Sequence, residues 1–386
     1  MTIKLFWEKP YEKTFHAEII DIDKNGIILD KTLFYPESGN QASDKGIIRK
    51  SGDIFKIDEV SLEGKKIIHH ISTDFKRKLE IGDEVEGQID WNHRYSLMKA
   101  HSSQHIVSAI LKNKFNIKTN KVKIRPNRVV IRLVNEIDFP TLQQVLNHVN
   151  KIFTLQKDKI KSNILPVKKA EEYKEHLRGG IPGKEQIRLV FTEDYDVTCC
   201  GGTHVQSTDE IGPIYIYEFK KGKKIKYYLG NKAMEHMSKY NTEFLQLGDL
   251  FRIPINQVTR RIKKRDKDIE ELFEEKEMLS TRILELIARN PDLEKNGLKI
   301  SLIPFSMEKD ILNKAFDTFP ENSVLIFRLK NQVVKIMTNS EKFNAAELLS
   351  KLFDKYGGQG GGNPRLAQGR MEKLPNNFID EIQKLI

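Results

Sequence analysis

Four side chains of the kinds that bind metals occur in this sequence as two pairs with the same spacing. His101 and His105 are four residues apart, and Cys200 and His204 repeat that spacing much later in the chain. Three imidazoles and one thiolate form the ligand set and number that a single Zn²⁺ takes through nitrogen and sulfur. Glycines between Cys200 and His204 allow the tight backbone turn that brings both side chains to one point. The sequence therefore predicts a zinc site formed by His101, His105, Cys200 and His204.

The predicted metal could serve catalysis or only stabilise the fold. Four protein ligands close a zinc site, and closed sites are typical of structural zinc. Structural sites usually draw their ligands from two short segments of one small module, whereas these pairs lie far apart. We therefore favour a catalytic or substrate-organising metal, with His204 or His101 giving way to water. A zincin-type protease is not predicted, because Ser102 and not glutamate follows the first histidine.

The two pairs are predicted to lie on different kinds of element. Apolar residues recur at helical spacing from Trp91 to Lys114 without proline or glycine, so His101 and His105 should share one helix face. The segment around Cys200 is rich in turn residues and lies between two predicted strands. These strands are residues 187–191 and 215–219. A helix and a loop that meet across a sheet would then form the metal site.

Four regions with different patterns follow one another along the chain. Residues 1–92 alternate short β-rich segments with Gly, Asp and Asn, which predicts an N-terminal β-barrel. Residues 93–232 mix helices with strands and carry the metal ligands, and residues 233–290 are helical. Residues 291–386 alternate strands and helices, as in a small C-terminal α/β domain. The predicted fold class is α+β: a barrel, an α/β zinc-containing domain, a helical hairpin or coiled coil, and this last domain.

Two predicted helices, residues 231–251 and 256–289, are separated by Pro254. In the second helix, six of eight a/d positions of a seven-residue repeat are apolar. These six are Ile262, Ile269, Leu272, Leu279, Ile283 and Leu286. The repeat is compatible with an antiparallel hairpin and with a dimerising coiled coil. Beyond it, a further helix is predicted at residues 310–319.

The composition favours a polyanionic partner. Lys and Arg number 65 against 54 Asp and Glu, which gives a net charge of +11. Such an excess favours nucleic acid as a partner, although a generally basic proteome would also produce it. No apolar run reaches the roughly 20 residues of a membrane helix, and no signal-peptide core occurs near the N-terminus. Cys199 and Cys200 are adjacent and cannot join distant segments, which predicts a reducing, cytoplasmic location.

Two polar segments are further candidates for binding sites. Residues 30–41 run from a strand into a turn, where Thr32 and Gln41 would line a pocket unless the segment is a plain turn. A glycine cluster contains Gly360, Gly361 and Gly362 but lacks the Walker lysine and the G-x-G-x-x-G spacing. Its backbone amides could bind an RNA phosphate, or the cluster could be a flexible loop.

Taken together, these segments resemble the editing domain of alanyl-tRNA synthetase. The resemblance rests on residues 32–36, on Gly39-Asn40-Gln41, on both metal-ligand pairs and on Ile211-Gly212-Pro213. The tail at residues 360–369 resembles the C-terminal DHHA1 domain of the same family. Because the sequence starts at the barrel, it is similar to the long form of the freestanding AlaX-type editing proteins, without the aminoacylation half.

The resemblance implies a trans-editing hydrolase that deacylates Ser-tRNA(Ala), and also Gly-tRNA(Ala), at a Zn²⁺ site. Residues 93–232 would be the editing domain and residues 291–386 the DHHA1 domain. Such a hydrolase acts as a second sieve, because a pocket for alanine cannot exclude glycine and rejects serine only modestly. The alternative is a tRNA-binding protein with structural zinc and no chemistry. A homodimer through the helical segment or the C-terminal domain is compatible with either.

The resemblance also suggests which residues contact the substrate. Thr32, Gln41 and Gln104, and more weakly Thr119, are candidates for the seryl hydroxyl or the terminal adenosine, and Gly360, Gly361 and Gly362 for the tRNA. No residue stands out as a general base. The family commonly has Gly-Gly-Gly-Gln in this turn, and this chain has Ser38-Gly39-Asn40-Gln41 instead. The difference puts the shape of the turn in doubt more than the presence of its glutamine.

Overall fold

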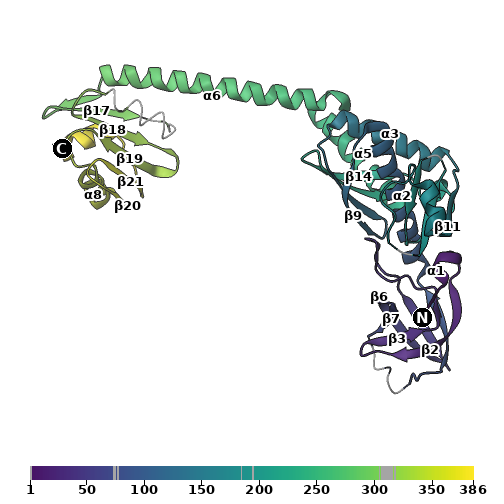
Figure 1. Cartoon of the computed structure of the whole chain (residues 1–386). Coiled ribbons are helices and arrows are strands. Elements are labelled where there is room, and N and C mark those ends of the chain that lie inside the picture. The colour runs from purple at the N-terminus through teal and green to yellow at the C-terminus, as the bar shows by residue number, and fades with distance from the viewer. Residues whose placement is uncertain are drawn as a thin grey trace. The chain divides into compact units, whose positions relative to one another are not determined.

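The computed structural model describes residues 2–72, 75, 78–183, 185–193, 195–303, 305, 316 and 319–386. The chain divides into two compact units, Met1–Gln246 and Leu247–Ile386 (Figure 1). Helices and strands alternate in both units, which confirms the predicted α+β class. Within the described residues, no helix is both long and apolar enough to span a bilayer.

The first unit begins with a closed six-stranded barrel, as predicted. Its order is β2-β3-β7-β6-β5-β8. The strands are β2 (Thr14–Ile22), β3 (Gly26–Leu29), β5 (Gly46–Lys50), β6 (Asp53–Glu63), β7 (Lys66–Ile71) and β8 (Glu84–Ile89). Residues of β2 are alternately buried and exposed, so its apolar side chains fill the barrel interior. Strand β8 was not predicted from the sequence. Its alternate positions carry Glu84 and Glu86, which are not typical strand residues.

The N-terminal residues close one side of this barrel. A short helix, α1 (Leu5–Glu8), follows β1 (Ile3–Lys4), which pairs in parallel with β4 (Lys31–Thr32). Phe6 of α1 is buried in the barrel core. The next residue, Trp7, therefore lies at the surface between the barrel and the rest of the unit.

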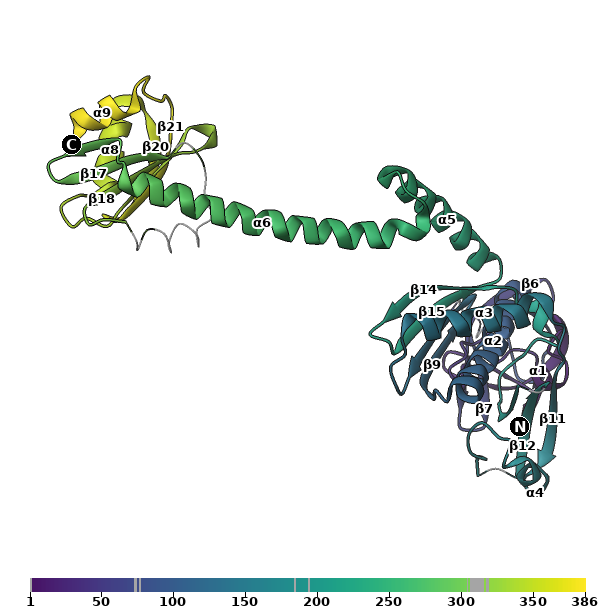
Figure 2. The same cartoon turned by 90° about the horizontal axis from the view of Figure 1, so that it is seen from above.

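A long helix, α2 (Trp91–Phe115), forms the centre of the second part of this unit. The Asp90 side chain caps it by accepting a hydrogen bond from the His93 backbone N–H at 3.1 Å. Together with α3 (Phe139–Leu155), it packs on one face of a sheet with the order β14-β15-β10-β9 (Figure 2). These strands are β9 (Thr119–Arg125), β10 (Arg128–Leu133), β14 (Ile214–Lys220) and β15 (Lys224–Leu229).

A second sheet in this part carries the cysteine segment. It consists of β11 (Ile160–Pro166), β12 (Gln186–Thr192) and β13 (Asp196–Cys199), all antiparallel, and the short helix α4 (Val167–Ala170) follows β11. Because β13 ends at Cys199, Cys200 begins the loop that follows the strand. The predicted helix at 91–114 and strands at 187–191 and 215–219 all coincide with observed elements.

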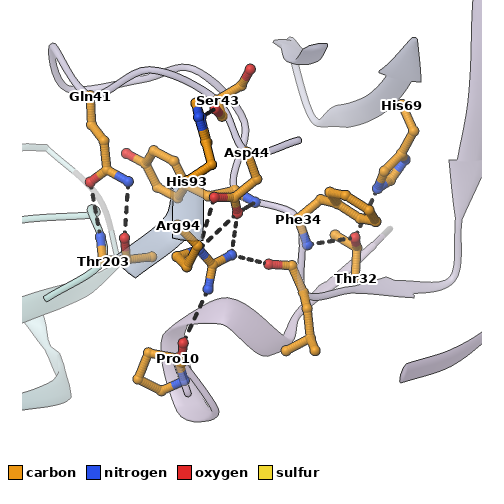
Figure 3. Close-up of polar contacts among 12 residues, drawn as sticks. Pro10, Thr32, Phe34, Gln41, Ser43, Asp44, His69, His93, Arg94 and Thr203 are labelled. Carbon is orange, nitrogen blue, oxygen red and sulfur yellow. Dashed lines mark hydrogen bonds and ion pairs between the residues drawn. The ribbon is translucent and has the colours of Figure 1, made fainter. Parts of the chain in front are cut away.

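A buried ion pair fixes the start of α2 to the barrel (Figure 3). The Arg94 guanidinium and the Asp44 carboxylate are both fully buried, and Arg94 Nε lies 2.9 Å from each carboxylate oxygen. Arg94 also donates to the carbonyls of Leu33 and Pro10, while Asp44 accepts from the Tyr35 backbone N–H. The pair therefore joins the segment after β4, the N-terminal segment and α2 at one point.

Two helices, α5 (Asn231–Phe251) and α6 (Val258–Arg289), follow the sheets, as predicted. The six apolar a/d residues of α6 are all exposed, by 39% for Ile283 to 63% for Leu272. The coiled coil and the homodimer therefore stay predictions. Leu284 is instead buried and packs with Phe319, Leu325 and other residues of the second unit.

The second unit contains one six-stranded sheet with the order β16-β17-β18-β19-β21-β20. Its strands are β16 (Leu293–Lys295), β17 (Leu298–Ile303), β18 (Ser323–Arg328), β19 (Val333–Thr338), β20 (Gly358–Gly362) and β21 (Leu366–Met371). Helices α8 (Ala345–Tyr356) and α9 (Phe378–Leu385) contribute to its core. The helix predicted at 310–319 falls almost entirely outside the described residues.

The glycine cluster is an edge strand, and the flexible-loop interpretation is wrong. Gly360, Gly361 and Gly362 belong to β20, which pairs antiparallel with β21. A Cβ on Gly360 would lie 2.4 Å from the Gly369 Cα, and one on Gly362 would lie 2.2 Å from the Leu366 carbonyl oxygen. Close packing thus requires glycine at these two positions, whereas a Cβ on Gly361 would meet open space.

Candidate metal centre

The two histidines of α2 and the cysteine loop converge on one point in the first unit. His101, His105, Cys200 and His204 each offer a ligand atom, and these four atoms lie within 4.8 Å of one another. His101 and His105 are buried because α2 packs on the sheet β14-β15-β10-β9, on α3 and against the loop that carries Cys200. The spacing of four residues on a helix therefore did place both imidazoles on one side, toward the loop.

The distances among these atoms fit a tetrahedral metal ion. Cys200 Sγ lies 3.4 Å from His101 Nε2 and 3.3 Å from His204 Nε2. With zinc bonds of about 2.1 Å to nitrogen and 2.3 Å to sulfur, two such ligands would be about 3.6 Å apart. The ring centroids of the three histidines are 4.4 to 4.9 Å apart. The donor set and its spacing thus fit one Zn²⁺.

Gln41 orients His101. Its Oε1 lies 2.6 Å from His101 Nδ1 and also accepts from the Thr203 backbone N–H at 3.2 Å, while its Nε2 donates to Thr203 Oγ1 at 2.9 Å. Because Oε1 can only accept, the His101 proton sits on Nδ1 and leaves Nε2 free for a metal. Gln41 is therefore a positioning residue, and both its amide oxygen and its amide nitrogen already have partners.

The turn before Gln41 keeps the shape that this contact needs. Gly39 and Asn40 both have left-handed backbone conformations, with φ of 56° and 68°. Asparagine is one of the few residues other than glycine that adopts this conformation readily. Asn40 at a position where glycine is common therefore leaves the turn intact.

The other two histidines are also held through their Nδ1 atoms. His204 Nδ1 lies 3.1 Å from Ser102 Oγ. His105 Nδ1 lies 3.4 Å from Asp196 Oδ2 without the alignment of a hydrogen bond, so this contact is mainly electrostatic. Asp196 is itself held by Arg178 through two hydrogen bonds of 2.8 Å. Such supporting groups fix the orientation of metal-binding imidazoles.

A buried arginine shapes the cysteine loop. Arg188 Nη1 donates to the carbonyl oxygens of Cys200 and Gly202, each at 2.9 Å, and Nη2 donates to Ser162 Oγ at 3.1 Å. A Cβ on Gly202 would lie 2.2 Å from His101 Cε1, so this position accepts only glycine while His101 keeps its place. On the outer side of the loop, Trp7 Nε1 donates to the Gly201 carbonyl at 2.7 Å.

The surroundings of Cys200 and His204 favour the protonation states that a metal requires, whereas those of His105 favour the imidazolium, whose proton a metal would have to displace. Burial alone would raise the pKa of the Cys200 thiol, but the three surrounding imidazoles lower it well below its usual value. Burial lowers the pKa of His204 to about 3. Burial would likewise lower the pKa of His105, but the Cys200 thiolate and Asp196 outweigh this effect and raise it. A thiolate and neutral imidazoles are the forms that coordinate zinc.

A cavity of about 790 Å³ opens onto the cluster. Its wall includes three of the four candidate metal ligands, His101, His105 and Cys200. The remaining lining comes from α1, the segment after β4, α2, β9 and β13, and includes Trp7, Tyr35, Gln104, Thr119, Lys121 and Thr198. This volume lies within the usual range for small-molecule sites. No Asp or Glu belongs to the described residues that line it.

The structure separates the predicted substrate contacts. Gln104 and Thr119 line the cavity, whereas Gln41 lies behind His101 and Thr32 lies inside the barrel. The Thr32 hydroxyl is 2.8 Å from His69 Nε2 and accepts from the Phe34 backbone N–H at 3.0 Å (Figure 3). Thr32 therefore supports the strand end and does not belong to the cavity wall.

The residues that hold His105 and the cysteine loop in place were not predicted from the sequence. They are chiefly Asp196, Arg178 and Arg188. Arg188 did carry a signal, because it is a charge within the apolar run Ile187 to Phe191. Asp196 and Arg178 lie in turn-rich segments where charged residues are ordinary. Their role depends on which strands become neighbours, so no local pattern marks them.

Three protein families match parts of the chain. Residues 4–93 match the class II (A) tRNA synthetases, and residues 187–226 match the second additional domain of threonyl and alanyl tRNA synthetases. Residues 299–386 match the DHHA1 domain. The first two matches fall on the barrel and on the sheets that carry Cys200 and His204.

Individual relatives extend this similarity over the whole chain. The alanyl-tRNA editing protein AlaX-L of Pyrococcus horikoshii is 32% identical over 98% of this chain and 97% of its own length. The alanine–tRNA ligases of Aeropyrum pernix and Pyrococcus abyssi are 26% and 28% identical. The alignments cover 99% and 100% of this chain but only 45% and 44% of those ligases.

Proposed function

Because the chain belongs to the freestanding alanyl-tRNA editing proteins of the AlaX-L type, we propose that it hydrolyses the ester of tRNA(Ala) mischarged with serine, and also with glycine. In this proposal His101, His105, Cys200 and His204 bind Zn²⁺ in the cytoplasm. The observation that carries it is the cavity of about 790 Å³ whose wall contains three of these residues. A metal that only stabilised the fold would need no such access.

The residues of the cavity give the metal a chemical role. A bound zinc ion would polarise the ester carbonyl or supply a nucleophilic water at neutral pH. Neither Tyr35 nor Cys199 of the lining offers a competing base: burial raises the pKa of Tyr35 to about 12 and also raises the pKa of the Cys199 thiol. Both groups are therefore protonated at neutral pH, and the remaining polar side chains serve to orient the substrate.

Gln104 is the best placed of the predicted substrate contacts. It lies between His101 and His105 on α2 and lines the cavity. Its Nε2 donates to Ser108 Oγ at 2.8 Å, which fixes the amide and leaves Oε1 as an acceptor. We propose that Oε1 accepts a hydrogen bond from the seryl hydroxyl. Alanine lacks this hydroxyl and would leave the buried amide oxygen unpaired.

Replacing Gln104 with leucine is expected to lower kcat/KM for Ser-tRNA(Ala) by about tenfold, because one hydrogen bond to the substrate is lost. The rate with Gly-tRNA(Ala) should change little, since glycine has no hydroxyl. Steady-state deacylation of both substrates measures this difference. Ser108→Ala is the matched control, because it removes the internal partner of Gln104 and keeps Oε1. An equal loss with both substrates would instead assign Gln104 to the terminal adenosine.

The tRNA is expected to contact the second unit as well. Gly361 is exposed in the edge strand β20, and no packing contact within the described residues requires glycine there. An edge strand leaves every second backbone N–H unpaired, so the stretch Gly360, Gly361 and Gly362 could present one or two amides to an RNA phosphate. We retain this cluster as a proposed tRNA contact.

The editing proposal predicts selective release of serine. Purified protein should deacylate Ser-tRNA(Ala) at least about 100-fold faster than Ala-tRNA(Ala), because a site built around a hydroxyl rejects a substrate without it. Release of labelled serine and alanine from the two substrates measures this ratio. Tight binding of tRNA without deacylation would refute the hydrolase and favour the non-catalytic protein with structural zinc.

A further inference from the structure

The sheet β14-β15-β10-β9 has one face that α2 and α3 do not cover (Figure 2). Strand pairing arranges the outward residues of this face, which we call the outer sheet face, in three rows across the four strands. The rows are Arg125-Arg128-Tyr228-Tyr215, Lys123-Val130-Lys226-Glu218 and Lys121-Arg132-Lys224-Lys220. Eight of these twelve positions are basic and one is acidic.

Most of this positive charge is not neutralised within the protein. Glu218 pairs with Lys224 at 3.0 Å and with Lys226 at 2.7 Å, and Arg125 lies 3.5 Å from Glu37. In the part of the chain that the structure describes, no carboxylate pairs with Lys121, Lys123, Arg128, Arg132 or Lys220. Four of these five lie on β9 and β10, and all five are exposed.

Like charges also face each other directly on this surface. Arg125 is the cross-strand partner of Arg128, and Lys121 is the partner of Arg132. Like charges at such positions destabilise a sheet, whereas an ordinary solvated sheet face combines both signs. A bound polyanion would remove this cost, so the arrangement is better explained by binding than by solvation.

The aromatic end of the face shows which part of a polyanion it contacts. Tyr228 stacks on Tyr217 with 4.2 Å between ring centroids and on His236 of α5 with 4.5 Å. Tyr215 stacks in turn on Tyr240 at 5.7 Å. Because these rings already pack on one another, they offer little open surface to a base. The exposed groups on β9 and β10 are cations, which suit phosphates.

The outer sheet face continues into the cavity at the metal centre. Thr119, Asn120, Lys121 and Val122 of β9 line the cavity, and Lys121 also begins the all-basic row. An RNA whose 3′ end enters the cavity would therefore meet Lys121 first and then the remaining rows. Anionic membranes or acidic proteins lack this connection to the cavity, so RNA is the favoured occupant.

We propose that the outer sheet face binds the phosphate backbone of the tRNA whose aminoacyl end lies in the cavity. This inference rests on the proposed function for the identity of the RNA. The charge pattern and the link to the cavity come from the first unit alone. Phosphate contacts set affinity and register without reading the sequence, so the face should bind tRNAs of different identity about equally.

The test is a triple variant, Lys123→Gln, Arg128→Gln and Arg132→Gln, which leaves Lys121 at the cavity unchanged. Its Kd for uncharged tRNA(Ala) transcript is measured by filter binding between about 50 and 300 mM salt. We expect binding at least about tenfold weaker near 150 mM and a salt slope smaller by about 2 to 3, or one per phosphate contact. The melting temperature should stay equal or rise, because like-charge contacts are relieved.

The matched control is Lys24→Gln, Lys65→Gln and Lys174→Gln, which removes three exposed cations elsewhere in the first unit. It should bind tRNA like the unmodified protein. Two results would overturn the proposal. The first is a triple variant whose Kd and salt slope for tRNA are unchanged. The second is a control variant that binds tRNA as weakly as the triple variant does. Hydrolysis of 3′-O-seryl-adenosine, which has no RNA helix, should be unchanged in the triple variant. If the unmodified protein releases no serine but the triple variant still loses tRNA binding, the editing function fails and the RNA surface stands.

Discussion

The Cys200→Ala protein is expected to lose its metal and to deacylate Ser-tRNA(Ala) at least about 1000-fold more slowly. Cys200 Sγ contacts the Nε2 atoms of His101 and His204, so its removal takes away the central donor of the cluster. A metal that polarises an ester contributes several kcal/mol to the transition state, and each 1.4 kcal/mol is about tenfold in rate. Elemental analysis and single-turnover deacylation measure the two effects.

Cys199→Ala is the matched control, because it makes the same change at the neighbouring residue. Cys199 lies outside the four converging ligands. The control should therefore keep its metal and lose little activity. Two results would contradict the catalytic site: a Cys200→Ala protein that retains the metal, or one that loses the metal and still releases serine at the original rate. The second result would assign the metal a structural role.

The largest expected effect on stability comes from Arg94→Met. Arg94 and Asp44 are both fully buried, and removal of the guanidinium leaves the carboxylate without its counter-charge. Breaking a buried pair in this way costs about 3–5 kcal/mol of unfolding free energy. Both tryptophans, Trp7 and Trp91, lie in the first unit. Urea unfolding followed by tryptophan fluorescence therefore reports on this unit alone.

Two further variants separate loss of charge pairing from loss of packing. Arg49→Met makes the same substitution at a half-buried arginine whose partner is the neutral Gln88, and it should cost much less. The double variant Arg94→Met/Asp44→Leu leaves no unpaired charge, so its loss should be smaller than the sum of the two single losses. Additive losses would show that the two residues act independently.

The supporting residues of the metal centre show where local patterns stop being informative. Gln41 was recognised as a site residue, yet its contacts identify it as the group that orients His101. Thr32 belonged to the same segment, but its hydroxyl points to His69 inside the barrel. The two residues are close in sequence and lie on different sides of the turn. Sequence proximity alone could not distinguish them.

The outer sheet face illustrates the same limit for charge. The sequence showed an excess of 11 positive charges, but no row of cations. Arg128 and Arg132 belong to β10, while Lys121 and Lys123 belong to β9. Their alignment depends on strand register, which long-range packing of the opposite face determines.

The sequence by itself predicted the clustering of His101, His105, Cys200 and His204, the helix that carries two of them, most of the barrel strands and the α+β class. These features depend on spacing of four residues on a helix or on alternation along a strand, which are local properties of the chain. Only the tertiary structure decided the roles of Gln41, Asp196 and Arg188, the position of Thr32 and the alignment of the basic rows. Each of these depends on which distant segments become neighbours, and packing of the whole unit selects those neighbours.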